Sequence, residues 1–514
     1  MSLLVMRVDE VLRGVEYVRR AGGDAEVAGV EYDSRRVKPG SLFVAMRGES
    51  TDGNRYIEKA IEAGAVAVVT DSAASFEEAV RLHPELAVAE VAHGRKALAG
   101  VSASFFFHPE RALALSGVTG TNGKTTTAFL LDAMLNHAGR RTVLVGTIEY
   151  HVAGEVRPSP HTTPESRDLM ELFREGVKAG VSEVVMEVSS HGLEQGRVHR
   201  LPFDTAIFTN LTRDHLDFHG TMEHYFAAKR KLFDGSLGRP PRVAVLNIED
   251  AHGAELALTA REAGSEVFSY GLGVGEFRAG NVEMEPGGMR FQLQTPVGEV
   301  EIATRLTGKV NIYNLLAACA AAYARGLSLD EIRGGAASLT CVPGRFQTVD
   351  AGQPFAVVVD YAHTDDALRN LTAVAREFVR AKGGRVITLF GCGGDRDRTK
   401  RPLMGRAAGE GSDVVYLTSD NPRSEDPEAI MADAVSGLDA TGTRYILEAD
   451  RATAILLALE EARAGDIVLL AGKGHEKTQT LKSGTVPFDD AQIALEILKG
   501  LSAGRAGRRE GASA

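Results

Sequence analysis

The run Gly117–Thr126, of sequence GVTGTNGKTT, has the residue types and spacing to bind nucleotide phosphates. An apolar, strand-like stretch, Ala112–Ser116, precedes it, and a helical pattern, Thr127–Leu135, follows it. Backbone N–H groups in such a loop, and the positive end of the following helix, face a bound anion. We expect the Lys124 ammonium to reach the terminal phosphates and the Thr125 hydroxyl to bind Mg²⁺. The predicted phosphate-binding residues are Gly120, Thr121, Asn122, Gly123, Lys124, Thr125 and Thr126.

This loop departs from the standard phosphate-binding motif at one position. Val118 stands where that motif has its first glycine, five residues before Gly123. Gly120 and Gly123 therefore provide the bends in a tighter version of the loop. The alternative interpretation is a plain glycine-rich turn without a ligand.

Two further side chains are candidates for metal binding, and a third lies on a basic helix. Glu187 ends an apolar strand pattern and could share a Mg²⁺ with Thr125, because Mg²⁺ prefers oxygen ligands. His215 lies in the polar segment 209–217 and is a candidate second ligand, although imidazole is unusual for Mg²⁺. Lys229 lies on an amphipathic helix, residues 225–233, that bears three cations. Taken singly, Glu187 could be a polar strand end, His215 a structural histidine and Lys229 part of a basic surface.

Composition narrows the class of protein. The chain has 514 residues, enough for about three domains of roughly 150 residues each. Its 44% apolar and 25% charged residues are ordinary for a globular protein. A net charge of -11 argues against a nucleic-acid partner, because phosphate backbones attract basic surfaces. No run of about 18 apolar residues predicts a membrane span, and no signal-peptide pattern opens the chain.

The three cysteines, Cys319, Cys341 and Cys392, are too few and too scattered for a disulfide framework or a zinc site. This fits a reducing cytoplasm, which is the expected location.

The chain divides into three regions by pattern. We place them at residues 1–110, 111–342 and 343–500, followed by a tail, 501–514, that is expected to be disordered. Apolar runs alternating with helical patterns predict an α/β fold with doubly wound parallel sheets in the second and third regions. Predicted strands of the second region are 141–148, 183–188, 205–209 and 242–247, then short antiparallel strands within 269–307 and a helix over 312–324. Predicted strands of the third are 356–360, 386–390, 414–418 and 467–471. Because open α/β sheets bind ligands beyond the carboxyl ends of their strands, we expect the chemistry just after these runs.

Six segments, in this order, resemble the Mur ligases, the family that builds the peptidoglycan peptide. They are the loop 119–126, the Glu187 segment, residues 210–217, the Ala227–Lys229 helix, the run GKVNIYN over 308–314, and VDYAH over 359–363. The resemblance covers nearly the whole chain. It implies a small N-terminal α/β domain that binds uridine, a central P-loop ATPase domain with an added small antiparallel sheet, and a C-terminal Rossmann-like domain that binds an amino acid.

The same resemblance assigns roles to individual residues. It implies that Lys229 carries a carbamate made from CO₂, whose oxygens hold a second Mg²⁺ beside His215. Asn311 and Asn314 would contact adenine, and Asp360 and His363 would approach ATP from the far side. The residues implied for a UDP-muramoyl dipeptide are Ser34, Glu49, Ser50, Thr51, Thr162, Thr163, Ser189, Gln195 and Arg197.

The third region carries the run Asp-Asn-Pro-Arg at 420–423, which within this family is associated with meso-diaminopimelate. Diaminopimelate has a second carboxylate that lysine lacks, and the Arg423 guanidinium could clamp it bidentately. The same guanidinium would repel the ammonium of lysine. Taken singly, the segments that carry these residues could be surface turns with charged side chains and no ligand. The residues implied for the pocket are Arg396, Asp420, Asn421, Pro422, Arg423, Gly472 and Glu476.

Together these features predict an ATP-dependent amide ligase that adds meso-diaminopimelate to UDP-N-acetylmuramoyl-L-alanyl-D-glutamate through an acyl phosphate. The expected participants are Mg²⁺ and these small molecules, and the expected state is a monomer whose domains close about a joint near Val342–Gly344. Ligases that add lysine, D-glutamate or D-alanyl-D-alanine remain alternatives, as does folate polyglutamylation. A non-catalytic ATP-binding regulator is the alternative from another class.

Overall fold

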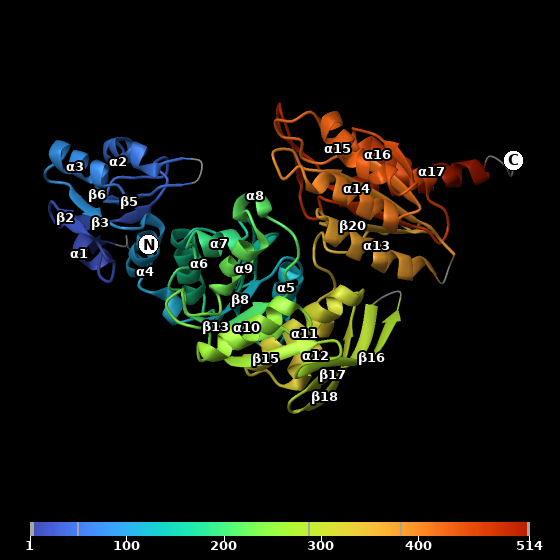
Figure 1. The fold of residues 1–514 in the computed structure, drawn as a ribbon, viewed down its shortest axis with the longest axis horizontal. Coiled ribbons are helices and arrows are strands. Elements are labelled where there is room, and N and C mark those ends of the chain that lie inside the picture. The colour runs from blue at the N-terminus through green and yellow to red at the C-terminus, as the bar shows by residue number, and fades with distance from the viewer. Residues whose placement is uncertain (1–4, 49–50, 286–287, 381–382, 511–514) are drawn as a thin grey trace.

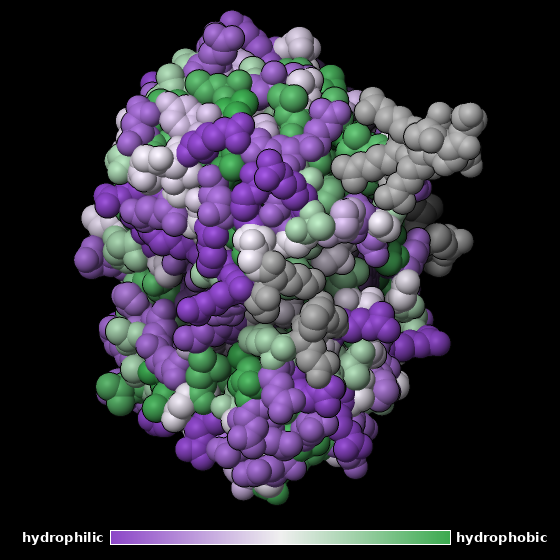
Figure 2. Space-filling model, turned by 90° about the vertical axis from the view of Figure 1, so that its right-hand side faces the viewer, coloured by the Kyte–Doolittle hydropathy of each residue, from purple (hydrophilic) through white to green (hydrophobic). Residues whose placement is uncertain are grey.

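The computed structural model describes residues 5–48, 51–285, 288–380 and 383–510. Figure 1 shows three α/β bodies that follow one another in chain order, with the central body touching both of the others. None of the described helices is long and apolar enough to cross a membrane. On the face in Figure 2, hydrophilic residues predominate and hydrophobic ones form small separate patches.

The N-terminal body is a five-stranded sheet covered by helices. Its spatial order is β2 (Arg19–Ala21), β7 (Ala87–Glu90), β6 (Ala65–Thr70), β5 (Ser41–Ala45) and β4 (Gly29–Glu31). Only β2 runs antiparallel to its neighbour. Helix α4 (Gly94–Phe105) packs against this sheet and against α6 (Ser166–Lys178), so it joins the first body to the second.

The central body is built on one continuous sheet of eleven strands. Their spatial order is β11 (Glu155–Pro158), β10 (Glu149–Val152), β9 (Thr142–Val145), β12 (Glu183–Glu187), β8 (Ala114–Thr119), β13 (Phe203–Phe208), β14 (Val243–Asn247), β15 (Glu266–Gly271), β16 (Phe277–Glu285), β17 (Gly288–Thr295) and β18 (Gly298–Thr304). The strands from β9 to β16 in this order are parallel, and antiparallel pairs extend both edges.

Successive residues of the buried strands enter two separate cores. Val184 and Met186 of β12 pack into the core beneath α6, whereas Val185 between them packs into the core beneath α5 (Lys124–His137) and α11 (Lys309–Ala324). Helices therefore cover both faces, which explains why these strands read as unbroken apolar runs.

The C-terminal body repeats this plan with six strands. Their order is β19 (Gln347–Thr348), β20 (Ala356–Asp360), β24 (Ile467–Ala471), β21 (Val386–Cys392), β22 (Val414–Ser419) and β23 (Arg444–Leu447), with only β19 antiparallel. One face packs on α13 (Asp365–Arg380), α14 (Lys400–Gly411) and α15 (Pro427–Asp439), and the other on α16 (Arg451–Glu461) and α17 (Asp490–Glu510).

The α/β class and the parallel sheets agree with the sequence prediction, and three details differ. The run 141–148 ends as a strand at Val145, and β10 then returns antiparallel to it. The antiparallel strands β16–β18 continue the large sheet, because β16 pairs with β15. Helix α17 continues to Glu510, into the region predicted as a tail. Residues 511–514 lie outside the described part of the chain.

Candidate active site

The loop between β8 and α5 has two positions that require glycine. Gly120 has φ +147°, and a Cβ there would lie 1.9 Å from Thr209 Oγ1. Gly123 has φ +86°, and a Cβ there would lie 2.4 Å from Asn314 Oδ1. Helix α5 begins at the next residue, so its positive end and free N–H groups open at the loop. This is the local geometry that binds phosphate.

Two lysines converge on one carbonyl of this loop. Lys124 Nζ and Lys229 Nζ each donate to Gly120 O at 2.9 Å. Lys229 is only 1% exposed, and its Nζ lies 4.5 Å from the centre of the Tyr225 ring. Burial, and then the neighbouring charge of Lys124, lower the pKa of Lys229 well below its usual value. The neutral form of the Lys229 amine is therefore more accessible than that of a lysine in water.

Glu187 lies beside the loop because β12 and β8 are adjacent parallel strands, with Glu187 opposite Val118. Its carboxylate accepts hydrogen bonds from Thr125 Oγ1 at 3.1 Å, Thr147 N at 2.8 Å and Thr147 Oγ1 at 3.0 Å. A carboxylate and a hydroxyl that face each other beside a phosphate site fit the oxygen ligands that Mg²⁺ prefers.

His215 lies on the other side of Tyr225. Its ring centre is 6.0 Å from that of Tyr225 and 4.9 Å from that of His191. Burial lowers the pKa of His215, and the cations around it, Lys124 and Lys229 among them, act in the same direction. Within the described residues, no three His, Cys, Asp or Glu side chains gather as a metal site. A second cation beside His215 would meet the carboxylate of Asp214, whose Oδ2 lies 3.5 Å from His215 Nε2.

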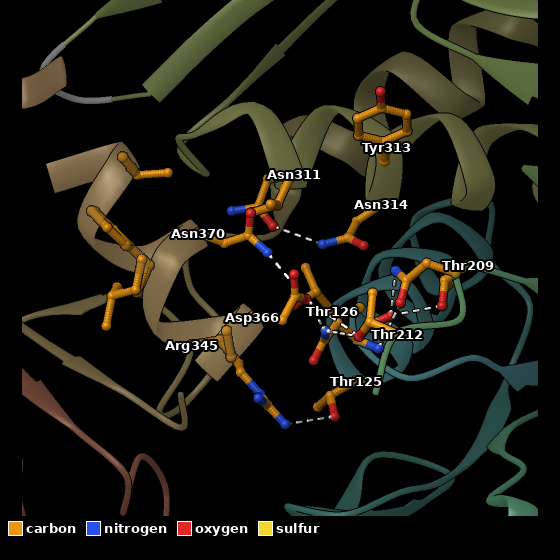
Figure 3. A pocket seen from close by; sticks show the side chains of 18 of the residues that line it. Thr125, Thr126, Thr209, Thr212, Asn311, Tyr313, Asn314, Arg345, Asp366 and Asn370 are labelled. Carbon is orange, nitrogen blue, oxygen red and sulfur yellow. Dashed lines mark hydrogen bonds between the residues drawn. The ribbon is translucent and has the colours of Figure 1, made fainter. Parts of the chain in front are cut away.

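A cavity of about 390 Å³ opens beside the loop, between the central and C-terminal bodies. In Figure 3, Asn311 and Asn314 come from α11 on one side, and Arg345, Asp366 and Asn370 from the C-terminal body on the other. Asn314 Nδ2 donates to Asn311 Oδ1 at 2.9 Å. The loop residues that line the cavity are Asn122, Gly123, Thr125 and Thr126.

The sequence analysis missed two residues of this cavity that bridge the bodies. Arg345 donates to Thr125 Oγ1 at 3.3 Å and lies over the Tyr361 ring. Asp366 accepts from Asn122 Nδ2 at 2.8 Å. Arg345 directly follows the joint expected at Val342–Gly344, so its place in the chain was a usable signal. Nothing comparable marks Asp366, the second residue of an exposed amphipathic helix.

A second cavity of about 390 Å³ lies between the same two bodies. Six residues predicted for diaminopimelate line it, namely Arg396, Asp420, Asn421, Arg423, Gly472 and Glu476. His191 and His215 of the central body form the facing wall. His363, predicted to approach ATP, lines this second cavity, whereas Asp360, predicted for the same role, lines the first cavity beside the loop.

Strand order explains this convergence. β24, β21 and β22 are neighbours in the sheet, so the loops beyond their carboxyl ends meet. The β21 and β22 loops touch at Gly394, where a Cβ would lie 1.9 Å from Pro422 O. Arg423 donates to Gly394 O at 2.8 Å, which holds its guanidinium at the cavity. Burial, and then the charge of Arg396, lower the pKa of Arg423, as expected of two cations that face one anion site.

Comparison with known proteins assigns the family. Residues 118–322 match the Mur ligase middle domain, 344–474 the Mur ligase glutamate ligase domain, and 26–106 the catalytic domain of the Mur ligase family. The chain is 53% identical to UDP-N-acetylmuramoyl-L-alanyl-D-glutamate–2,6-diaminopimelate ligase of Solibacter usitatus, over 96% of this chain and 99% of that one. The chain belongs to the Mur ligase family. It is also 45% identical to the ligase of the same name from Geobacillus thermodenitrificans, over 93% of this chain and 96% of that one.

Solved structures agree with the architecture of this Mur ligase. A structure of UDP-N-acetylmuramoyl-L-alanyl-D-glutamate–2,6-diaminopimelate ligase has a TM-score of 0.67 and 32% identity, and the match covers 97% of this chain and 99% of that one. Folylpolyglutamate synthase of Mycobacterium tuberculosis, at 20% identity, has a TM-score of 0.60 over 74% of this chain and 93% of that one, so it shares the fold.

Four of the residues expected to contact the UDP-muramoyl dipeptide form one connected group in the central domain of this Mur ligase: Thr162, Thr163, Ser189 and Arg197. Thr163 Oγ1 donates to Glu187 O at 2.9 Å and accepts from Ser189 N at 3.0 Å. Arg197 donates to Thr163 O at 2.8 Å. Thr162 joins the group through Thr147, whose hydroxyl is 3.0 Å from its own.

The remaining dipeptide residues lie elsewhere. Gln195 follows the short helix α7 (Ser190–Glu194), and Ser34 and Thr51 lie in the N-terminal domain. Glu49 and Ser50 lie outside the described residues.

Proposed function

We propose that this Mur ligase uses ATP to join meso-diaminopimelate to the D-glutamate end of UDP-N-acetylmuramoyl-L-alanyl-D-glutamate, for peptidoglycan precursor synthesis. The observation that carries the proposal is the second cavity, where Arg396 and Arg423 face the same space as Asn421 and Glu476. Relatives of 53% and 45% identity that bear this activity in their names support it.

The side chains of that cavity suit the second amino-acid head of diaminopimelate, which is the end that carries both an ammonium and a carboxylate. A planar guanidinium binds a carboxylate bidentately, and Arg423 is the one held in place at the cavity by Gly394 O. The Glu476 carboxylate suits the ammonium group of the same head. Lysine would offer an ammonium alone and would leave the two arginines without an anion, which disfavours it.

The nucleotide cavity suits ATP. The N–H groups at the start of α5 and the Lys124 ammonium would bind the phosphates, and Asn311 and Asn314 would contact the base. Arg345, from the C-terminal domain, donates to Thr125, so it would add a positive charge near the same phosphates.

Thr125 and Glu187 would hold one Mg²⁺, and His215 a second together with a carbamate on Lys229 formed from CO₂. Bound Mg²⁺ would neutralise phosphate charge during transfer. The carbamate is supported by the two amines that share Gly120 O, since charged forms of both would repel each other. Modification makes Lys229 an anion beside the Lys124 cation and would add its oxygens to the Asp214 carboxylate that lies beside His215.

The reaction would proceed in two steps. A carboxylate oxygen of the glutamate attacks the γ-phosphorus of ATP, and ADP leaves, which gives an acyl phosphate. The amine of diaminopimelate attacks the acyl carbon, and the tetrahedral intermediate collapses to an amide as phosphate leaves. Lys124 would stabilise the negative charge on the transferred phosphoryl group, and the C-terminal domain would hold the amine.

Residues of both domains line the two cavities, so we propose that closure about Val342–Gly344 precedes chemistry. One chain supplies both cavities, which supports a monomer, and the use of ATP supports a cytoplasmic site of action.

Phosphate release tests this function. The purified chain is assayed with ATP, Mg²⁺, the UDP-muramoyl dipeptide and one amine at a time. We expect turnover with meso-diaminopimelate and at least tenfold lower kcat/KM with lysine, about 1.4 kcal/mol of discrimination. Equal turnover with lysine would contradict the role of Arg423, and dependence on D-alanyl-D-alanine would assign another step of the same pathway.

A further inference from the structure

Lys473 is a buried cation directly behind the wall of the amino-acid cavity. It follows Gly472 at the end of β24, and its side chain is 0% exposed. Its Nζ lies 3.1 Å from Glu476 Oε2, 3.3 Å from Asn421 Oδ1 and 3.5 Å from Asp420 Oδ1. All three partners line the cavity, whereas Lys473 does not.

These contacts orient the Asn421 amide. Its Oδ1 accepts from Lys473 and, at 2.9 Å, from Thr480 N, so the oxygen faces away from Glu476. Its Nδ2 then donates to Glu476 Oε2 at 2.8 Å. Because Oε2 receives donors from both Asn421 and Lys473, the Oε1 atom of Glu476 is the one left to accept from a ligand.

The same contacts set the charge of this end of the cavity. Asp420 and Glu476 bring two carboxylates, and both touch Lys473. With Lys473 removed, two acids would share a buried space, where like charges interact strongly. Such a site would attract an unopposed ammonium. With Lys473 present, one of the two negative charges is offset, and a group that carries both an ammonium and a carboxylate matches Glu476 and Arg423 together.

We propose that Lys473 is a positioning residue that makes the amino-acid cavity select a zwitterionic group over a lone ammonium, by orienting Asn421 and by offsetting one of the two negative charges of Asp420 and Glu476. The inference rests on the proposed function, because it concerns the amino acid bound in the same cavity. Lys473 acts through Glu476 and Asn421 and does not touch the substrate.

A double-mutant cycle on the full-length protein tests this role. The variants are Lys473→Met, Glu476→Gln and the pair combined, with Lys473→Arg as the variant that keeps the charge. For each, kcat and KM are measured with diaminopimelate and with lysine, and the KM for ATP together with thermal unfolding reports on folding.

We expect Lys473→Met to raise the KM for diaminopimelate about tenfold and to lower the preference over lysine by a similar factor, with the KM for ATP within about twofold. Once Glu476 is neutral, the same replacement should change the KM for diaminopimelate by less than about threefold. Lys473→Arg should retain most of the preference.

Two results would overturn the inference alone: additive effects in the cycle, or equal losses with diaminopimelate and lysine accompanied only by a lower Tm. The unchanged enzyme separates the two hypotheses. If it fails to turn over diaminopimelate, the proposed function falls and this inference falls with it. If it turns over diaminopimelate and the cycle is additive, only the role of Lys473 falls.

Discussion

The two cavities have the same volume, about 390 Å³ each, and offer different chemistry to a ligand. The nucleotide cavity is lined mainly by amides and hydroxyls, together with four carboxylates, and Arg345 is the one cation among the described residues that line it. The amino-acid cavity is lined by charged and titratable side chains, including Arg396, Arg423, Asp420 and Glu476. Both lie between the same two domains, so position in the fold does not account for the difference.

The difference lies in where the binding charge comes from. In the proposed nucleotide site, the phosphates would bind to backbone N–H groups of one short loop and to the start of the helix that follows it. A zwitterionic head needs a cation and an anion at fixed separation, and side chains from three strand ends supply them. A backbone site tolerates many side-chain changes, whereas a side-chain site depends on single residues.

The largest expected effect concerns Lys229, which donates to Gly120 O of the phosphate loop and lies against the Tyr225 ring. We expect Lys229→Ala to lower kcat by about 10³-fold, because both metal placement and phosphate-loop contacts are lost. Steady-state phosphate release measures this, and ¹³C NMR after incubation with ¹³C-bicarbonate detects a carbamate in the unchanged protein. Arg230→Ala, at a half-exposed neighbour on the same helix, is the control. Activity of the Lys229→Ala variant above about a tenth would argue against a catalytic role.

A smaller and more selective effect is expected at Arg423. Arg423→Ala should lower kcat/KM for diaminopimelate about 10²-fold, in line with the ~2–5 kcal/mol lost when one partner of a buried charge pair is removed. The KM for ATP should stay unchanged, since Arg423 does not line the nucleotide cavity. Arg398→Ala, at an exposed arginine that pairs with Glu425, is the matched control. Parallel losses for ATP and diaminopimelate would mean that the cavities do not act separately.

The reciprocal change is Asn311→Ala. It leaves the Asn314 amide without its 2.9 Å partner and should raise the KM for ATP about five- to thirtyfold, or ~1–2 kcal/mol. The KM for diaminopimelate should not change. Nucleotide binding followed by calorimetry measures the effect directly. An unchanged affinity for ATP would remove Asn311 from the site.

The smallest effect concerns His151 in β10, which lines neither cavity. It measures how a charged side chain contributes to folding stability in the absence of a ligand. Burial opposes the charged ring, but Asp132 and Glu149 outweigh it and raise the pKa of His151 above its usual 6.5. The charged form therefore stabilises the folded state fully below pH 6.5, and this contribution is lost as the pH rises through the raised pKa.

We expect His151→Gln to lower Tm by about 1–3 °C at pH 5.5 and by less at high pH. Thermal unfolding across pH measures it. A difference that grows with pH would contradict the sign.

The sequence predicted the strands buried on both faces, such as β20 and β24, because two-sided burial produces unbroken apolar runs. Short edge strands such as β23 and β11 escaped prediction, since at least half of their side chains are exposed to solvent. Lys473 escaped for a related reason. Lysine is almost always exposed. No local sequence pattern identifies a buried lysine whose partners, Asp420, Asn421 and Glu476, come from two different loops.

What the amino-acid sequence determined by itself is the phosphate loop. Its two glycines, Lys124 and the helix start lie within a few residues, where sterics and local hydrogen bonds act. Tertiary structure alone decided the amino-acid cavity and the side on which His363 lies. The strand order β24-β21-β22 and the packing of the C-terminal domain on the central one bring Arg396, Arg423 and Glu476 opposite His215, and that order depends on long-range burial, which no short segment encodes.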